Sequence, residues 1–449
     1  MSASFSAAFL AREPRAERFL PAEYASAEGR RAAVKRAQGR RALPGLGLEP
    51  GAVAVVTGQQ VGLFLGPLYS AYKAATAIAA ARALQAETGV RCVPVFWLQT
   101  EDHDFEEIDH VHVLDAKGEL VRLHARVVAE PKTSVKHAVF GDDIGAAVKQ
   151  LREPELWAEH YRPGATWVGA FRGVLQALFP ELVVVDPCDC SEAAAPVHAR
   201  ALRDAAEISR VLEARSAELE AAGFDVQVRV KPGAALSFFP PEGPKGPRHR
   251  LDAGGEAGLD PLKRPGCFST SALLRPMLQD TLLPTAAIVG GPGELNYFAQ
   301  LAPLYAHFGI PMPMLVPRAR FRVVDHRARR LLEKLAEPGP ETAAGPSPDE
   351  LERQLVKAAD DALAGVPLPD AVKRTRGTIA RAASRLAGRY RRHLDGLDTV
   401  RADRQARLNA MLEPNGEPQE RVLGLPSFPG LDVLPHVDPW HASLKDVSP

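Results

Sequence analysis

The sequence predicts an α/β fold built on a parallel sheet, and three stretches of the chain support this prediction. Ala52 to His112 reads as an apolar strand, a glycine-spaced loop, a long Ala-rich helix and a second apolar strand. Thr285 to Val316 repeats that order. Strand, helix, strand is the pattern of a parallel βαβ unit. Asp370 to Leu412 has no Pro and carries apolar residues three and four positions apart, which predicts a helical hairpin or a dimerising arm, about 60 Å long if continuous.

The polar residues of the first unit gather where its two strands end. The first strand, Val53 to Val56, leads into Gln59 and Gln60, and the second, Cys92 to Leu98, leads into the cluster Glu101-Asp102-His103-Asp104. Ligands of open parallel sheets bind beyond the carboxyl ends of the strands. Because both polar segments fall at that edge, the sequence predicts the functional site there.

The composition of the 449-residue chain argues against several other classes of protein. Lys+Arg 55 and Asp+Glu 55 cancel, whereas a dedicated nucleic-acid binder carries a basic surplus. With only 4 Cys, a disulfide framework is not expected, and a reducing cytoplasm is the natural compartment. The charge-free interval between Glu49 and Lys73 is interrupted by Gly, Gln and Pro, so it predicts a buried strand and loop instead of a membrane span. We therefore expect neither nucleic acid nor membrane as a partner.

The first glycine loop has the composition of an anion cradle. Small residues let backbone N–H groups approach a phosphate or carboxylate, and Gln59 and Gln60 add side-chain donors. Lys73 follows on the helix and is positioned to add a counter-charge. Neither a Walker A nor a G-x-G-x-x-G pattern is present, so the alternative is that glycines such as Gly58 and Gly66 only allow tight packing of strand on helix.

The acidic cluster is the stronger candidate for chemistry. Three carboxylates beside an imidazole repel one another unless a cation or an ammonium group joins them. Asp102, His103 and Asp104 are therefore expected to bind an amine or the Mg²⁺ of a nucleotide, or to use His103 as a general base, with Glu101 assisting in binding. The alternative is an acidic, solvated strand end. His110 and His112 share a strand face, but without a nearby Cys pair a zinc site is not expected.

The second glycine loop predicts another anion site. Gly290-Gly291-Pro292-Gly293-Glu294 opens a helix, and helix N-termini present free backbone N–H groups and a partial positive charge. The alternative is a plain capped helix with Glu294 in its first turn. Arg275 and Arg318 are further candidates for gripping a carboxylate.

Changes in composition divide the chain. A Pro- and Gly-rich stretch from Pro338 to Pro348 reads as a hinge, and Pro240 to Pro265 reads as a loop or mobile connection. Phe224 to Val230 reads as a further strand. The expected divisions are a core of residues 1–330, a helical arm of residues 331–425 and a tail of residues 426–449 that packs back on the core.

Four blocks of the sequence, in this order, resemble one family. They are TGQQVGLFLGPLYSAYK, VPVFWLQTEDHDFEEIDHV, PTAAIVGGPGELNYFAQL and PNGEPQERVL. Together they resemble the cysteine-adding enzyme family of bacillithiol biosynthesis, BshC, over about residues 50 to 425. The resemblance implies a Rossmann-like nucleotide-binding core with connective insertions and a C-terminal α-helical coiled-coil arm that forms a homodimer.

The resemblance also implies a reaction, which joins L-cysteine to the amine of glucosaminyl-malate and so forms bacillithiol. Amide formation from a carboxylate is uphill in water, so ATP with Mg²⁺ is the expected driver. The expected substrate- or nucleotide-binding residues are Gly58, Gln59, Gln60, Gly66, Lys73, Glu101, Arg275, Gly290, Gly291, Gly293 and Glu294. Two alternatives stay open: a nucleotidyltransferase or sugar-transferring enzyme on the same core, and a non-catalytic nucleotide-binding scaffold.

Overall fold

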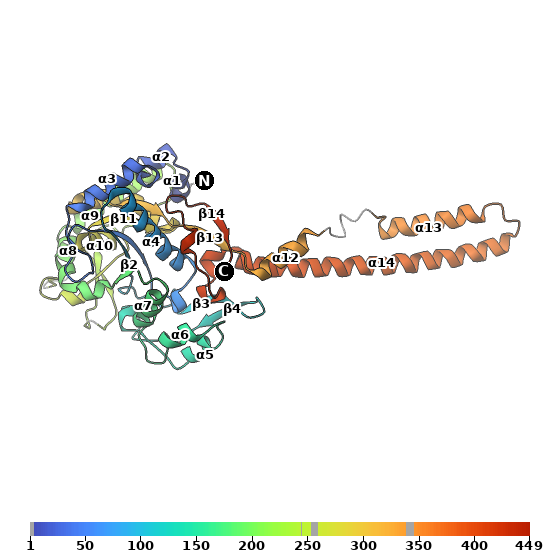
Figure 1. Cartoon of the computed structure of the whole chain (residues 1–449), viewed down its shortest axis with the longest axis horizontal. Helices are drawn as coiled ribbons and strands as arrows, with labels where there is room; N and C mark the ends of the chain where they lie inside the picture. Colours follow the sequence, from blue (N-terminus) through green and yellow to red (C-terminus); the bar gives the residue numbers. More distant parts are fainter. Residues whose placement is uncertain (1–3, 244, 253–258, 338–344) are drawn as a thin grey trace. The chain divides into compact units, whose positions relative to one another are not determined.

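The structure is a computed structural model that describes residues 4–243, 245–252, 259–337 and 345–449. Its contacts divide the chain into two compact units, drawn with the chain's colours in Figure 1. The first, which we call the core, comprises Met1–Val323 and Glu417–Pro449, and the second, the helical arm, comprises Val324–Gly416. The boundaries between the core and the helical arm therefore fall at 323/324 and 416/417, whereas the sequence suggested 330/331 and 425/426.

The second boundary lies earlier in the chain than the sequence suggested, because the residues that directly follow the helical arm are already hydrogen-bonded to the core. The Gln419 side-chain amide accepts from the N–H of Val323 at 2.7 Å and donates to its carbonyl at 3.0 Å. Four residues later the N–H of Leu68 donates to the Leu423 carbonyl at 2.8 Å. The tail ends in β14 (Leu444–Val447), which pairs in parallel with β13 (Arg320–Val323).

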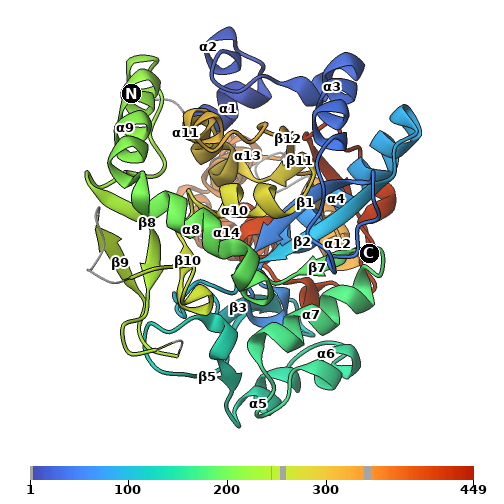
Figure 2. The ribbon, with the colours of Figure 1, turned by 90° about the vertical axis from the view of Figure 1, so that its left-hand side faces the viewer.

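A five-stranded parallel sheet forms the centre of the core, which confirms the predicted fold class. Its order is β12-β11-β1-β2-β7, and Figure 2 shows these strands side by side. Helices cover both faces, so the strands are largely apolar, and β1, β2, β11 and β12 are almost fully buried. The strands are β1 (Val53–Gln59), β2 (Cys92–Leu98), β7 (Val183–Val185), β11 (Thr285–Gly290) and β12 (Met314–Pro317).

The order of the strands places the two glycine loops next to each other. From β1 the chain crosses through α4 (Tyr69–Thr88) to β2 on one side. From β11, the neighbour of β1 on the other side, it crosses through α11 (Pro292–Phe308) to β12 in the opposite direction. Such a reversal is a topological switch point, where ligands of open α/β sheets bind. The loops after β1 and β11 both lie there.

Smaller elements surround this sheet. A three-stranded antiparallel sheet has the order β10-β8-β9, and two hairpins, β3–β4 and β5–β6, follow β2 in the chain. These strands are β3 (His110–Leu114), β4 (Leu120–His124), β5 (Val127–Val128), β6 (Val139–Phe140), β8 (Ala234–Phe239), β9 (His249–Asp252) and β10 (Ser269–Thr270). The remaining core helices are α1 (Phe5–Leu10), α2 (Pro14–Glu17), α3 (Ala27–Gln38), α5 (Ile144–Val148), α6 (Glu155–His160), α7 (Trp167–Leu178), α8 (Ser191–Arg203), α9 (Ala205–Ala221), α10 (Arg275–Leu282) and α15 (Gln419–Val422).

Two predictions for the middle of the chain were wrong. Phe224 to Val230 is not a strand, because the side-chain amide of Gln300 takes the place of a partner strand and bonds both the N–H and the carbonyl of Val228. Part of the predicted loop Pro240 to Pro265 is β9, which pairs with β8. Residues 244 and 253–258 of that stretch lie outside the described residues.

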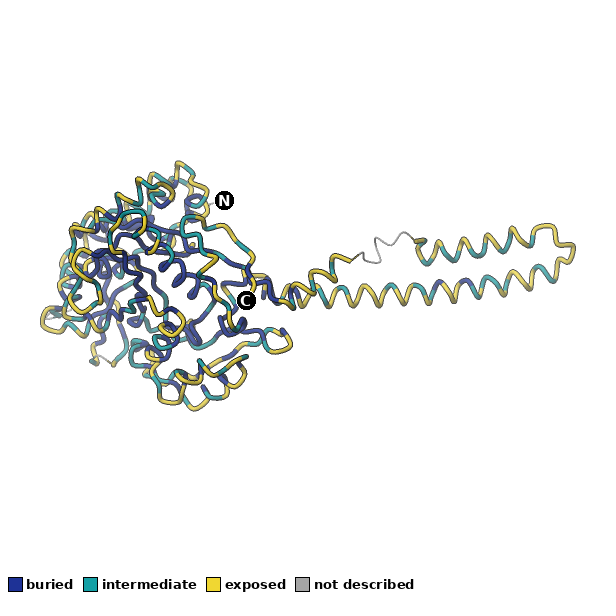
Figure 3. Tube along the Cα trace, in the orientation of Figure 1, coloured by how far each residue is buried: buried dark blue, intermediate teal, exposed yellow. Residues whose placement is uncertain are grey.

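The helical arm contains α12 (His326–Ala336), α13 (Pro348–Leu363) and α14 (Pro369–Leu412). The predicted long helix is confirmed, since the 44 residues of α14 are continuous and span about 66 Å. Figure 1 shows α13 alongside α14, and the burial colours of Figure 3 show both helices largely exposed. Most of the predicted hinge, residues 338–344, lies outside the described residues. No helix in the described part of the chain is long and apolar enough to span a membrane.

Candidate active site at the carboxyl edge of the parallel sheet

One cavity of about 960 Å³ opens at the switch point and brings both glycine loops and the acidic cluster together. Its lining includes Gln59 and Gln60 after β1, Asp102 after β2, and Gly291 after β11. Ten of the predicted site residues line it: Gln59, Gln60, Lys73, Glu101, Asp102, His103, Arg275, Gly291, Gly293 and Glu294. Gly58, Gly66, Gly290 and Asp104 are not among the lining residues.

Gly58 and Gly66 shape the backbone of the first loop. A methyl group at Gly58 would lie 2.7 Å from the carbonyl oxygen of Trp97 on the neighbouring strand. Gly66 has φ +66°, and the two residues before it, Phe64 and Leu65, also have positive φ. This geometry matches the alternative interpretation, in which these glycines permit close packing and an unusual turn.

Lys73 joins the two glycine loops. Its ammonium lies 2.6 Å from Oε2 of Glu294 and donates to the Gly58 carbonyl at 2.9 Å and to Oε1 of Gln59 at 2.8 Å. Burial lowers the pKa of Lys73, and the Glu294 carboxylate opposes that effect. All three donors of the ammonium are engaged, so Lys73 holds the loops together and has no donor left for an anion.

Glu294 caps the helix that follows the second loop. The oxygen that meets Lys73 also accepts the backbone N–H of Gly291 at 2.9 Å. The alternative interpretation of Glu294 as a helix-capping residue therefore describes its geometry. Its carboxylate serves both the helix and the ion pair.

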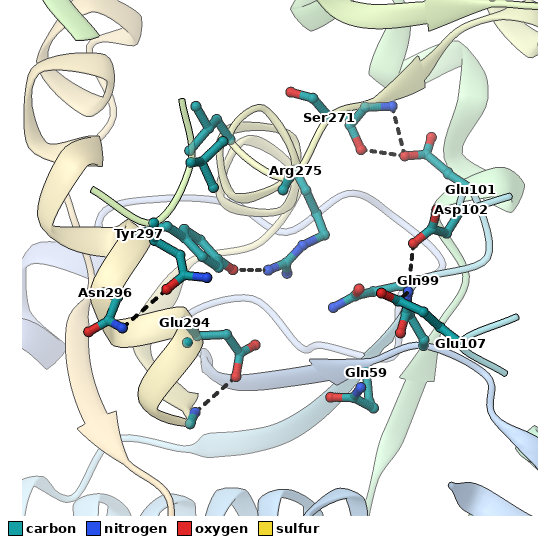
Figure 4. A pocket seen from close by; sticks show the side chains of 18 of the residues that line it. Gln59, Gln99, Glu101, Asp102, Glu107, Ser271, Arg275, Glu294, Asn296 and Tyr297 are labelled. Atoms are coloured by element: carbon teal, nitrogen blue, oxygen red, sulfur yellow. Dashed lines mark hydrogen bonds between the residues drawn. The ribbon is translucent and has the colours of Figure 1, made fainter. Parts of the chain in front are cut away.

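Gln60 gathers two carboxylates on the acidic side of the cavity. Its amide nitrogen donates to Oδ2 of Asp102 at 2.8 Å and to the Glu107 carboxylate. Figure 4 shows Asp102 and Glu107 together on one side of the cavity, and Arg275 with Tyr297 on the other. Two carboxylates this close favour a positively charged ligand group between them.

Glu101 is part of the framework of this side. It is buried, and its carboxylate accepts from both the backbone N–H and the hydroxyl of Thr270 on β10. Burial raises the pKa of Glu101, and the Thr270 hydrogen bonds oppose that effect. Glu101 thereby ties the end of the parallel sheet to the small antiparallel sheet.

Arg248, which the sequence did not single out, contacts the acidic cluster. It lies just before β9, in the stretch predicted as a loop, and its Nη1 is 3.1 Å from Nδ1 of His103. The same Nη1 lies 4.0 Å from Oδ1 of Asp102. The sequence around Arg248 gave no sign of this contact, because His103 is 145 positions away in the chain.

The opposite side of the cavity is cationic. The Arg275 guanidinium donates to the Tyr297 hydroxyl on α11. Arg318 is 4% exposed and packs so closely against the second loop that a methyl group at Gly291 would lie 3.3 Å from its Nε. Glu420 belongs to the fourth sequence block. Its Oε1 forms ion pairs with Nη2 of Arg318 at 2.9 Å and with Nε of Arg320 at 3.1 Å. The site predicted from the sequence omitted Glu420, although this residue lies in PNGEPQERVL, one of the four blocks that resemble the family.

The described residues do not form a metal site of their own. Among them, no group of three or more His, Cys, Asp or Glu side chains could hold a metal ion. His110 instead lies 2.8 Å from Asp109, which also contacts His124 across the β3–β4 hairpin at 3.2 Å.

Comparison with known proteins identifies the family. Residues 36–258 and 260–319 match the family described as "Bacillithiol biosynthesis BshC, N-terminal Rossmann-like domain". A relative from Koribacter versatilis is 35% identical over 86% of this chain and 81% of its own length. Relatives from Solibacter usitatus and Heliobacterium modesticaldum are 34% and 32% identical, over 81% and 79% of this chain and 72% and 70% of their own lengths. All three are named "Putative cysteine ligase BshC". The chain belongs to the BshC family of bacillithiol biosynthesis.

Proposed function

We propose that this protein joins L-cysteine to the amine of glucosaminyl-malate and thereby forms bacillithiol, with ATP activating the cysteine carboxylate. The observation that carries the proposal is the division of one cavity into an acidic and a cationic side. The reaction needs both, because its substrates carry amino groups, on cysteine and on the glucosamine, and also anionic groups, the phosphates of ATP and the carboxylates of malate. The names of the relatives support the same activity.

The cationic side suits the anionic groups. The first turn of α11 leaves backbone N–H groups without partners inside the helix, and Gly291 and Gly293 let a ligand approach them. Arg275 and Arg318 add guanidinium charge at the same place. These residues fit a phosphate or a carboxylate, and ATP with its magnesium would supply the leaving group that makes amide formation favourable.

The acidic side suits the amines. Asp102 and Glu107, brought together by Gln60, favour an ammonium group over an anion. In the amide-forming step an uncharged amine attacks the activated cysteine carboxyl carbon, the leaving group departs, and one amine proton must be removed. Holding the amine among carboxylates both orients it and provides acceptors for that proton.

The assay for this function follows the product and the nucleotide together. Purified protein is incubated with L-cysteine and glucosaminyl-malate, with and without Mg-ATP, and analysed by mass spectrometry. We expect bacillithiol only with ATP, accompanied by AMP if the intermediate is an acyl-adenylate or by ADP if it is an acyl-phosphate. Nucleotide cleavage without bacillithiol would favour a nucleotidyl- or sugar-transferring enzyme. Nucleotide binding with neither product would favour the scaffold.

Asp102→Asn is expected to lower kcat/KM for glucosaminyl-malate by about 100-fold or more, because it removes one of the two charges that hold the amine. The matched control is Glu106→Gln, which neutralises an exposed carboxylate in the same segment that is not among the lining residues. Equal activity of the Asp102 variant and this control would contradict the assignment.

We further propose that the helical arm forms a homodimer. Its support is a row of exposed apolar side chains on α14, in which Leu386, Leu397 and Val400 are 52%, 44% and 45% exposed. The double variant Leu386→Glu/Leu397→Glu is expected to sediment as a monomer, whereas the parent sediments as a dimer. A monomeric parent, or a variant that remains dimeric, would contradict this interface.

We also infer a cytoplasmic location, which the four free cysteines favour.

A further inference from the structure

Arg248 is held by three separate parts of the core. Its backbone N–H donates to the Lys132 carbonyl at 3.0 Å, and its Nε donates to Oγ of Ser269 at 2.8 Å. Nη2 donates to the Thr270 carbonyl at 3.3 Å, and the guanidinium carbon lies 4.7 Å from the centroid of the Phe238 ring. The residue is 8% exposed. A guanidinium with this many contacts has one orientation.

That orientation determines which nitrogen of His103 carries the proton. Nη1 of Arg248 lies 3.1 Å from Nδ1 of His103. A guanidinium has only donors and keeps its charge, so Nδ1 must be the acceptor and carries no hydrogen. The neutral imidazole then has its hydrogen on Nε2.

The surroundings of the ring keep it uncharged. Burial is the largest effect and lowers the pKa of His103, and the positive charge of Arg248 lowers it further. Lys132 adds to this effect, while Asp102 and Asp104 on the same loop act in the opposite direction. The net effect is a pKa below the ordinary value, so the neutral ring is favoured.

We propose that His103 takes part in the reaction as a hydrogen-bond donor through Nε2–H, and that Arg248 is the positioning residue that fixes this tautomer. A general base needs an unshared electron pair, yet Nδ1 is occupied by Arg248 and Nε2 bears the proton. No described residue accepts from Nε2, and His103 lines the cavity, so the donor is available to a ligand oxygen. The natural recipient is the carboxyl oxygen of the activated cysteine, where negative charge grows during attack. This role rests on the proposed function and differs from the general base, which was one of the three roles that the sequence left open for this cluster.

The tautomer can be measured without any substrate. In full-length protein labelled with ¹⁵N-histidine, the His103 signals are those that disappear in His103→Gln. We expect long-range ¹H–¹⁵N spectra to show the Nε2–H form at neutral pH, and Arg248→Ala to convert it to a mixture of forms. A native Nδ1–H form, or an unchanged pattern in Arg248→Ala, would overturn the proposal. Because this measurement needs no turnover, its result stands even if the proposed reaction fails.

The kinetic test is a double-mutant cycle in the cysteine-addition assay. Arg248→Ala and His103→Gln are each expected to lower kcat by about 100-fold, and the double variant to be little worse than either, because both changes remove the same hydrogen bond. Guanidine added to the buffer should restore part of the Arg248→Ala activity. Losses that multiply in the double variant would show that Arg248 acts independently of His103.

Two further variants separate positioning from folding. Arg248→Lys keeps the charge but cannot make all the guanidinium contacts at once, so it should fold and still show a changed His103 spectrum. Arg264→Gln is the matched control. The guanidinium carbon of Arg264 lies 5.0 Å from the ring centroid of Phe239, which neighbours Phe238 on β8. Arg264 is exposed and is not among the residues that line the cavity. It should leave both the His103 spectrum and the activity unchanged. A changed His103 spectrum in the control as well would reduce Arg248 to a structural role.

Discussion

Replacing Lys73 by Met is expected to destabilise the core by about 3–5 kcal/mol, because it leaves a largely buried carboxylate without its partner. Glu294 is 15% exposed in its side chain and Lys73 only 5%. The Gly58 carbonyl and Oε1 of Gln59 would also lose their donor. Urea denaturation at neutral pH measures the loss, and the assay described above measures the accompanying fall in activity.

The double variant Lys73→Met/Glu294→Gln distinguishes the two roles of Lys73. A Gln at position 294 can still accept the N–H of Gly291 but carries no charge, so about half or more of the lost stability should return. Activity should stay at least about 100-fold low, because Gln59 is no longer held. Full recovery of activity along with stability would show that Lys73 serves folding alone.

Acidification from about pH 6.5 to pH 3 is expected to remove about 4 kcal/mol of stability through His198 alone. This residue on α8 is fully buried, its Nδ1 lies 2.8 Å from Oγ of Ser237, and its Nε2 has no described partner. Burial, assisted by the charge of Arg248, lowers the pKa of His198 to about 3. Between that value and the unfolded pKa of about 6.5, the unfolded chain binds a proton that the folded chain does not.

Acidification therefore destabilises the fold through His198. The stabilising contribution is fully present above the unfolded pKa, falls as pH falls, and levels off below about pH 3. Urea denaturation of the wild type should show a loss of about 3 kcal/mol from this residue by about pH 4.5. The double variant His198→Leu/Ser237→Ala has no group to titrate and leaves no hydroxyl without its partner. It should lose correspondingly less between the same two pH values, and an equal loss would refute the assignment to His198.

Local patterns in the sequence were sufficient to predict the parallel sheet and the polar residues at its carboxyl edge. The apolar runs of β1, β2, β11 and β12 appear in the sequence because strands covered on both faces are built mainly from apolar residues. The glycine turns and the acidic cluster followed those strands directly, so their place at the carboxyl edge followed from βαβ geometry. The same reasoning predicted the long α14, whose spacing is a property of one continuous segment.

Local patterns failed where a hydrogen bond crossed the fold. Phe224 to Val230 looked like a strand, but Gln300, 72 positions from Val228, satisfies its backbone instead. Lys73 looked like a free counter-charge, because nothing near it in the chain revealed Glu294 as its partner.

The sequence by itself determined the α/β class, the parallel order within each βαβ unit, the helical arm, and the edge at which the polar residues gather. Only the tertiary structure decided that both glycine loops face one cavity, that Lys73 joins them, and that Arg248 meets His103. The physical reason is the range of the interactions. Periodicity and turn chemistry act over a few residues and leave their mark in the sequence, whereas the partner of a buried charge is chosen by packing and can lie anywhere in the chain.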